Sequence, residues 1–376
     1  ETGRRSSANW INFGNFWWNR MTDSELRAFV HVWNMMIQDL RDQDFVCDEE
    51  IRMLRIPNAE DARQGPPHIP PILDPLSMVV PRRVLPKNKE AKRRIITFAR
   101  SVQMRGIPLG TVRDMPSVTI LIPHYSETIL YNREELFPDG TSSEVLRFLI
   151  KYYSDEFRNF VMRVGAPGAL GGITARTVHS FTGERSARIS GLEKELCKWA
   201  SLRMQTLFRT VRGICHAYET ALSTLLNLQE QGKLTQEECD ELLKDRLQVV
   251  VAMQLYSHFT DITGPKFDVH KTAAAEALLQ TFPRFLNIAF IDEEQTDEGT
   301  KYYSCLIDAT CTSVERSTIG RESTVAASQR RSSTVVPPAA RKARLRVELP
   351  GPPILGHGKS DNQNCAIIFT RGEIMQ

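Results

Sequence analysis

The stretch that most constrains the fold reads PILGHGKSDNQNCAIIFTRGE and covers residues 353–373. It joins a glycine-rich loop around Lys359 to the polar cluster Asp361–Asn364 and to an apolar run, Ala366 to Phe369, which we expect to be a strand. Glycines let backbone N–H groups approach phosphate oxygens closely, and a lysine adds a flexible cation. The amides of the polar cluster can read the edge of a sugar or a base. The stretch therefore predicts a loop that binds a nucleotide sugar.

A P-loop is the nearest alternative, because Gly358-Lys359-Ser360 ends like a Walker A motif and the run from Asn287 to Glu294 reads like a Walker B strand. The first Walker glycine would stand five residues before Gly358, where this chain has Pro353. The strand with the aspartate also precedes the loop instead of following it. A P-loop NTPase stays open as a second enzyme class.

Length and composition narrow the class of protein. The chain has 376 residues and a formal net charge of +3, which allows one large or two ordinary domains. This mild charge argues against a nucleic-acid partner, which would require a concentrated basic stripe.

The seven cysteines are scattered and include no C-x-x-C pair, so reduced thiols in a cytosolic setting are expected rather than disulfides or a zinc site. No apolar run reaches the roughly 18 to 20 residues of a membrane span, and no secretory signal opens the chain.

Three segments are expected along the chain. Residues 1–56 should be helical and begin a helix at the capping box Thr22–Glu25, and residues 57–115 should combine a proline-rich connector with a helix. Residues 116–376 should form an α/β domain, because short β-rich runs recur in it. These runs are Val118 to Ile122, Val249 to Met253, Ile288 to Ile291, Tyr302 to Ile307 and Leu345 to Leu349. Residues 164–191 and 312–344 are rich in small and polar residues and are expected to be mobile loops.

The longest helical pattern runs from Gly191 to Leu228, with most of its large apolar residues on one face. Arg203 falls within that apolar face. A buried guanidinium needs a carboxylate or a phosphate partner, because an unpaired buried charge costs several kcal/mol. A structural salt bridge and a role near the nucleotide both remain open for Arg203.

Several motifs in the same order resemble the plant and fungal 1,3-β-glucan (callose) synthases, glycosyltransferase family 48. Besides residues 353–373, they are Trp33 to Phe45, Glu90 to Ile95, Val118 to Glu127 and Trp199 to Gly213. Together they span the chain from about residue 30 to its last residue. One departure is Cys365, which stands where the family usually has histidine, so a catalytic histidine in this loop is in doubt.

The resemblance implies a GT-A-like (Rossmann-like) nucleotide-sugar-binding half-domain with large helical additions. Its first strand would end at Tyr125 and Glu127, its second at Asp292 and Glu293, and its third would lead into the loop with Lys359. Tyr125 would pack against uracil, Asp292 would accept from the uracil N–H, and Lys359 would neutralise the diphosphate. The other candidate binding residues are Asp361, Asn362, Asn364 and Arg203.

The resemblance also implies an activity. The parent enzyme would transfer glucose from UDP-glucose to the 3-hydroxyl of a growing β-1,3-glucan with inversion, on the cytosolic face of the plasma membrane, and this segment would work with the rest of a membrane-embedded synthase. The acceptor base and other catalytic residues are expected beyond Gln376, so the segment should bind the donor without transferring glucose. The sequence leaves the need for a divalent metal open.

A non-catalytic function is the third hypothesis. Residues 1–115 and the long helix could form a docking platform for a regulator such as a Rho-type GTPase. The absence of any nucleotide effect on the folded chain would favour this reading over both enzyme classes.

Overall fold

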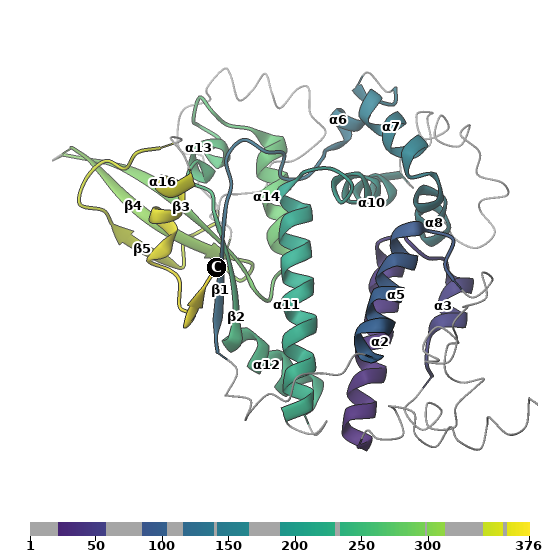
Figure 1. Cartoon of the computed structure of the whole chain (residues 1–376). Helices are drawn as coiled ribbons and strands as arrows, with labels where there is room; N and C mark the ends of the chain where they lie inside the picture. Colours follow the sequence, from purple (N-terminus) through teal and green to yellow (C-terminus); the bar gives the residue numbers. More distant parts are fainter. Residues whose placement is uncertain are drawn as a thin grey trace, which may run out of the picture. The chain divides into compact units, whose positions relative to one another are not determined.

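The computed structural model describes residues 22–57, 85–103, 116–138, 141–164, 189–229, 234–297, 299–312, 341–355 and 359–376 (Figure 1). Most of the proline-rich connector and most of the two loops expected at 164–191 and 312–344 lie outside these residues. The chain divides into two compact units, whose boundaries cut across the three expected segments. Unit 1 comprises Glu1–Arg113, Glu144–Arg185 and Thr220–Cys239, and unit 2 comprises Asp114–Ser143, Ser186–Glu219 and Asp240–Gln376. The expected domain boundaries stay a prediction.

Unit 1 is helical in its described part. It contains α2 (Asp23–Asp42), α3 (Asp48–Leu54), α5 (Lys89–Gln103), α7 (Glu144–Tyr152) and α8 (Ser154–Val164). The expected capping box of α2 is confirmed, because the Thr22 hydroxyl accepts from the Glu25 amide at 3.2 Å and the Glu25 carboxylate accepts from the Thr22 amide at 2.7 Å. Trp33 and Ile37 are fully buried in the core beneath α2, and the Trp33 indole donates to the Leu54 carbonyl. Trp33 and Ile37, four residues apart, therefore lie on the packed face of α2.

Unit 2 is built on one six-stranded mixed sheet. Its strands are β1 (Val118–Pro123), β2 (Leu247–Ala252), β3 (Leu286–Thr296), β4 (Gly299–Asp308), β5 (Leu345–Glu348) and β6 (Ile374–Met375), in the order β5-β4-β3-β2-β1-β6. The pairs β6·β1, β1·β2 and β2·β3 are parallel, whereas β3·β4 and β4·β5 are antiparallel. The strands expected over Val118 to Ile122 and in the next four β-rich runs are confirmed.

Helices cover both sides of the parallel strands. The helices with residues in unit 2 are α6 (Arg133–Leu136), α10 (Ile189–Ser201), α11 (Leu207–Gln229), α12 (Gln236–Arg246), α13 (Tyr256–Thr260), α14 (Val269–Thr281) and α16 (Lys359–Ile367). Every residue of β2 is buried, as in a central parallel strand that is packed on both faces. Figure 1 shows α16 on one side of β1 and β2 and α14 on the other. Among the described helices, none combines the length and the apolar character required to cross a bilayer.

The run Ala366 to Phe369 is helical and turn-like rather than a strand, so this expectation was wrong. It forms the end of α16 and the turn that follows it. Ala366 and Phe369, three residues apart, are buried against Leu121 and Val250, while Ile367 and Ile368 between them are exposed. A spacing of three between the buried residues fits a helical turn and conflicts with the alternation of a strand.

The long helix expected from Gly191 to Leu228 is divided into α10 and α11, and Arg203 lies in the break instead of on a continuous apolar face. The first amides of α11 donate outside the helix, from Leu207 to the Thr128 carbonyl and from Phe208 to the Ile129 carbonyl, both at 3.0 Å. These bonds attach the start of α11 to the loop after β1. The break therefore exists because the N-terminal amides of a second helix bind that loop.

Candidate functional site

The loop after β1 begins the candidate site. The Tyr125 amide donates to the Glu127 carboxylate at 3.0 Å, and a ring nitrogen of His124 lies 3.0 Å from the Glu127 carbonyl oxygen. The Tyr125 side chain is 40% exposed, so its ring is accessible to a ligand. Desolvation and the nearby Glu127 and Asp361 carboxylates raise the pKa of the Tyr125 hydroxyl. Burial lowers the pKa of His124 despite the opposing effect of Glu127.

Asn362, in the first turn of α16, joins the ends of two parallel strands. Asn362 is 3% exposed. Its side-chain nitrogen donates to the His124 carbonyl at 2.7 Å, and its side-chain oxygen accepts from the backbone N–H of Gln254 at 3.4 Å. His124 directly follows β1, and Gln254 lies two residues after β2. Asn362 therefore attaches α16 to the carboxyl edge of the sheet, and both ends of its amide are occupied by the backbone.

From this edge α16 runs back across the sheet. The side-chain amide of Gln363 donates to the Leu121 carbonyl, and the side-chain amide of Gln248 donates to the Phe369 carbonyl at 3.1 Å. The chain then reaches β6, which pairs with Val118 and Thr119 at the start of β1. The N-terminus of α16 consequently lies at the carboxyl edge of the parallel strands, where α/β sheets bind ligands.

Lys359 is the first residue of α16, and its side chain is exposed. It forms no ion pair with any residue that the structure describes. The free amides of a helix N-terminus and an adjacent cation favour a phosphate. Asp361 is half-buried, and Asn364 is exposed on the same helix. The glycines that precede Lys359, at 356 and 358, lie outside the described residues.

Gln254 is a polar residue of this edge that the sequence analysis missed. It is 5% exposed, and its side-chain amide donates to the carbonyls of Asp361 at 3.0 Å and Ile354 at 3.3 Å. Its own carbonyl accepts from the Ile291 amide at 3.2 Å, which links the loop after β2 to β3. Its signal in the sequence is its position directly after the apolar run Val249 to Met253, because polar residues that follow parallel strands collect at the edge where α/β sheets bind ligands.

Asp292 and Glu293 do not end a strand, contrary to expectation. β3 pairs with β2 only through Ala289 and then continues to Thr296 as a hairpin arm with β4. The hairpin carries both carboxylates past the edge of the parallel sheet. An extended antiparallel partner, β4, is the physical reason that the strand continues.

Asp292 and Glu293 line a pocket of about 650 Å³ within unit 2. The Arg346 guanidinium lies 3.5 Å from Asp292 and 2.6 Å from Glu294, and it stacks over the Tyr303 ring. Because Glu294 is the closer partner of Arg346, Asp292 keeps acceptor capacity toward the pocket. The lining also includes His258, whose ring is 3.4 Å from Glu293, together with Lys266, Lys342 and Ala343.

The buried hydroxyl and thiol in this pocket are poor nucleophiles. Burial raises the pKa of the Cys305 thiol to about 12 and raises the pKa of the Tyr256 hydroxyl. Both groups are therefore protonated at neutral pH, and a thiolate mechanism is unfavourable here.

Among the described residues, no cluster of three or more His, Cys, Asp or Glu side chains is arranged to hold a metal ion.

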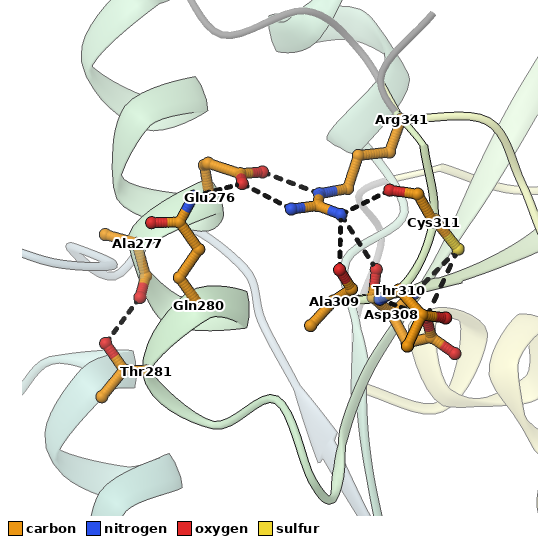
Figure 2. A network of polar contacts seen from close by, with 9 residues as sticks. All are labelled: Glu276, Ala277, Gln280, Thr281, Asp308, Ala309, Thr310, Cys311 and Arg341. Atoms are coloured by element: carbon orange, nitrogen blue, oxygen red, sulfur yellow. Dashed lines mark hydrogen bonds and ion pairs between the residues drawn. The ribbon is translucent and has the colours of Figure 1, made fainter.

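One wall of the pocket is anchored by the network in Figure 2. The Arg341 guanidinium binds both oxygens of Glu276, at 2.8 and 2.5 Å, and donates to the carbonyls of Ala309 at 3.0 Å and Cys311 at 2.6 Å. The Lys342 amide donates to the Thr312 carbonyl at 3.0 Å. These bonds join the described residues on either side of 313–340, so Arg341 and Lys342 keep a defined position in the pocket wall.

Arg203 stands apart from this pocket lining. Its guanidinium stacks on the Trp199 ring at 4.3 Å and donates to the Trp199 carbonyl at 3.1 Å. The residues flanking its turn hold the loop after β1, since the Ser201 hydroxyl accepts from the Tyr131 amide at 2.9 Å. The structure thus groups Tyr125, Glu127, Asp361 and Asn362 at the carboxyl edge and places Asp292 and Glu293 in the pocket that Gln254 connects to that edge.

Comparison with known proteins identifies the family. A family model described as 1,3-beta-glucan synthase component matches residues 84–376. Callose synthase 4 of Arabidopsis thaliana is 32% identical in an alignment 322 positions long, which covers 78% of this chain and 15% of that protein. The 1,3-beta-glucan synthase component bgs1 of Schizosaccharomyces pombe is 30% identical in an alignment 329 positions long, which covers 78% of this chain and 17% of that protein. The chain thus spans less than a fifth of the length of these relatives, and it belongs to the 1,3-β-glucan synthase component family.

Proposed function

We propose that this chain is the donor-binding part of a 1,3-β-glucan synthase and binds UDP-glucose in a GT-A-like, Rossmann-like half-domain. The observation that carries the proposal is the position of α16. Asn362 attaches its first turn to the ends of β1 and β2, so that Lys359 and the helix N-terminus lie at the same edge as Tyr125. This is the edge at which open α/β sheets collect nucleotides.

Each candidate residue has a physical role in this proposal. Lys359 and the first amides of α16 neutralise the diphosphate, which is the charge that a helix N-terminus favours. The exposed Tyr125 ring packs against uracil, and Glu127 holds the loop that carries it. Asp292 accepts from the uracil N–H, because its carboxylate is only the second partner of Arg346. We assign Asn362 to positioning, since its amide is already occupied.

The pocket residues suggest how the donor extends from that edge. Lys266 and Arg346 are cations in the lining, and Glu293 is a carboxylate that can accept from sugar hydroxyls. A pocket of about 650 Å³ is within the range of small-molecule sites. Asn364 and Arg203 are proposed at the periphery of the donor, the first on the exposed side of α16 and the second behind the loop after β1.

The complete reaction is proposed for the whole synthase. The bond between the anomeric carbon and the diphosphate would break, UDP would leave, and the 3-hydroxyl of a β-1,3-glucan would attack from the opposite face. Because the chain spans only 15–17% of the relatives reported above, we assign it donor binding rather than the complete transfer. The membrane-embedded remainder, a position on the cytosolic face of the plasma membrane and regulation by a Rho-type GTPase belong to the same proposal.

Titration of UDP and UMP into the chain tests the proposal. Lys359→Ala should weaken UDP binding by about 1.5 to 3 kcal/mol, the range for a hydrogen bond to a charged group, and should weaken UMP binding much less. Lys151→Ala removes a similarly exposed lysine from α7 and serves as the matched control. Equal small losses for UDP and UMP in the Lys359 variant would contradict the proposed diphosphate contact.

A P-loop NTPase remains a second candidate, because α16 begins at Lys359, directly after a glycine, as a Walker A helix would. Two features argue against a P-loop. Pro353 occupies the position of the first Walker glycine, and the preceding strand, β5, lies at the outer edge of the sheet. Comparing ATP with UDP in the same titration separates the two. Tight ATP binding without UDP binding would favour the P-loop, and binding of neither nucleotide would favour a docking module.

A further inference from the structure

Unit 1 contains a second pocket, of about 670 Å³, that the donor site does not explain. Three of its helices contribute to the lining: α2 with Gln38, Arg41 and Asp42, α3 with Asp48, Ile51 and Arg52, and α8 with Arg163; Arg55 follows α3. Four arginines thus line one pocket, against two aspartates. We name it the arginine pocket.

Arg41 lies at its base with a donor that is not used. The Arg41 side chain is 8% exposed, and its Nε donates to the Asp48 carboxylate at 2.6 Å. Its Nη1 lies 3.7 Å from Asp44 and makes no hydrogen bond with any described residue. Leaving a buried charged donor without an acceptor costs about 1–3 kcal/mol or more. A ligand oxygen bound at Nη1 would remove that cost.

The floor around Arg41 is rigid. Asp44 is buried, adopts a positive φ of 64°, and binds Arg163 through both carboxylate oxygens, at 2.8 and 3.1 Å. The Asn159 amide donates to the Asp44 carbonyl at 2.9 Å. This carboxylate is therefore committed to Arg163, and it cannot move to satisfy Arg41 Nη1 without breaking two shorter bonds.

Arg52 and Arg55 stand at the rim, and both side chains are exposed. Neither forms an ion pair with a residue that the structure describes. Arg52 lies in the last turn of α3, and Arg55, three residues later, is the C-cap residue of the same helix. Two exposed cations beside a buried unused donor create a site for an anion.

The chemistry of the lining selects the class of anion. The planar guanidinium offers paired N–H donors that match phosphate oxygens, and several arginines together favour a dianion over a single carboxylate. The pocket is larger than one phosphate requires and lies within the range of small-molecule sites. We propose that the arginine pocket binds a compact, multiply phosphorylated polyol, either as a free molecule or as the headgroup of a lipid.

The soluble arm of the test uses inositol hexakisphosphate, with inorganic phosphate as a weaker probe, titrated into the whole chain. Arg52→Gln combined with Arg55→Gln should weaken binding about tenfold or more. The matched control combines Arg27→Gln with Arg147→Gln, two exposed arginines outside the pocket, and should change binding less than about twofold. Equal losses in the two double variants would reduce the effect to net charge and overturn the proposal.

Arg41→Lys separates a specific contact from general electrostatics. Lysine keeps the positive charge but cannot retain both the Asp48 bond and the Nη1 donor. Thermal unfolding confirms that the variant is folded, and inositol hexakisphosphate binding should then fall about tenfold. Unchanged affinity in a folded Arg41→Lys variant would refute the role of Nη1, and the rim variants still test the pocket if Arg41→Lys does not fold.

The lipid arm uses sedimentation with phosphatidylcholine vesicles that do or do not contain a phosphoinositide. Vesicle binding that depends on Arg52 and Arg55 and is displaced by inositol hexakisphosphate supports a lipid headgroup. Tight binding of the soluble probe without vesicle binding supports a free ligand. No binding of either probe to the wild-type chain overturns the proposal, and Lys359→Ala should affect neither arm.

Discussion

The side-chain amide of Asn362 donates to the backbone carbonyl of His124 at 2.7 Å, across 238 positions of sequence. The bond connects the N-terminal turn of α16 to the residue that follows β1. The other end of the same amide accepts from Gln254, after β2. One buried side chain thus sets where Lys359 and Asp361 lie relative to Tyr125.

Asn362→Ala should therefore destabilise the chain. Removing the side-chain amide leaves two buried backbone groups, the His124 carbonyl and the Gln254 N–H, without this hydrogen-bond partner. The loss should lower the free energy of unfolding by about 1–3 kcal/mol. Urea denaturation followed by circular dichroism measures the loss. Asn364→Ala, two residues along the same helix and exposed, should change the free energy by less than about 0.5 kcal/mol. A similar loss in both variants would contradict the special position of Asn362.

Asp292→Asn should reduce the preference for UDP over CDP by about tenfold or more. A carboxylate accepts from the uracil ring N–H, whereas cytosine presents an acceptor there, and an asparagine amide can donate to it. Competition titration of UDP against CDP measures the ratio. Asp297→Asn makes the same chemical change at an exposed aspartate outside the pocket lining and should leave the ratio unchanged. Unaltered selectivity in Asp292→Asn would place the uracil contact elsewhere.

Glu276→Gln should destabilise the chain in a pH-dependent manner. The hydrogen bond from Arg341 holds the pKa of the Glu276 carboxyl below its usual value of 4.5. A lowered folded-state pKa means that the ion pair contributes fully above about pH 4.5 and is lost as the pH falls through the folded-state pKa. At pH 7 the variant should lose about 1–3 kcal/mol of stability. Urea denaturation at a series of pH values should show the difference from wild type shrinking below pH 4.5.

Glu348→Gln is the control for this experiment, because Glu348 is exposed and its ion pair with Lys301 is long, at 3.9 Å. Its effect should stay below about 1 kcal/mol at every pH. A pH-independent difference between wild type and Glu276→Gln would show that packing, and not the charge, is what Glu276 supplies.

Gly372→Ala should weaken the attachment of β6 to β1. A Cβ at this position would lie 2.4 Å from the Thr119 backbone nitrogen and 2.8 Å from the Val118 carbonyl carbon, where only the backbone could move. The expected loss of unfolding free energy is about 1–3 kcal/mol. Gly213→Ala, in α11 with nothing within 4 Å, should instead be neutral or stabilise by up to about 1 kcal/mol. Equal effects of the two substitutions, measured by thermal unfolding, would refute the close approach.

Local patterns were sufficient where one residue type dictates one geometry. The capping box at Thr22 predicted the start of α2, because its hydrogen bonds join residues only three positions apart. The β-rich runs predicted β1 to β5, because a short apolar run bounded by polar residues favours a buried strand. The glycine-rich loop pointed to Lys359, and the resemblance to the 1,3-β-glucan synthases implied Tyr125. Their binding roles stay predictions.

The tertiary structure decided the remainder. The run Ala366 to Phe369 is too short for its apolar content to distinguish a strand from a helical turn, and only the sheet surface under Ala366 selects the helix. α10 and α11 separate because the loop after β1 binds the first amides of α11, a partner some 80 positions away that no local pattern contains. Asp292 lies on a hairpin arm because β4 extends β3, and Gln254 connects the two halves of the site through contacts 100 to 111 positions away. The sequence by itself determined most of the elements, whereas long-range backbone partners decided where α11 begins, that Ala366 to Phe369 is helical and turn-like, and which polar residues meet.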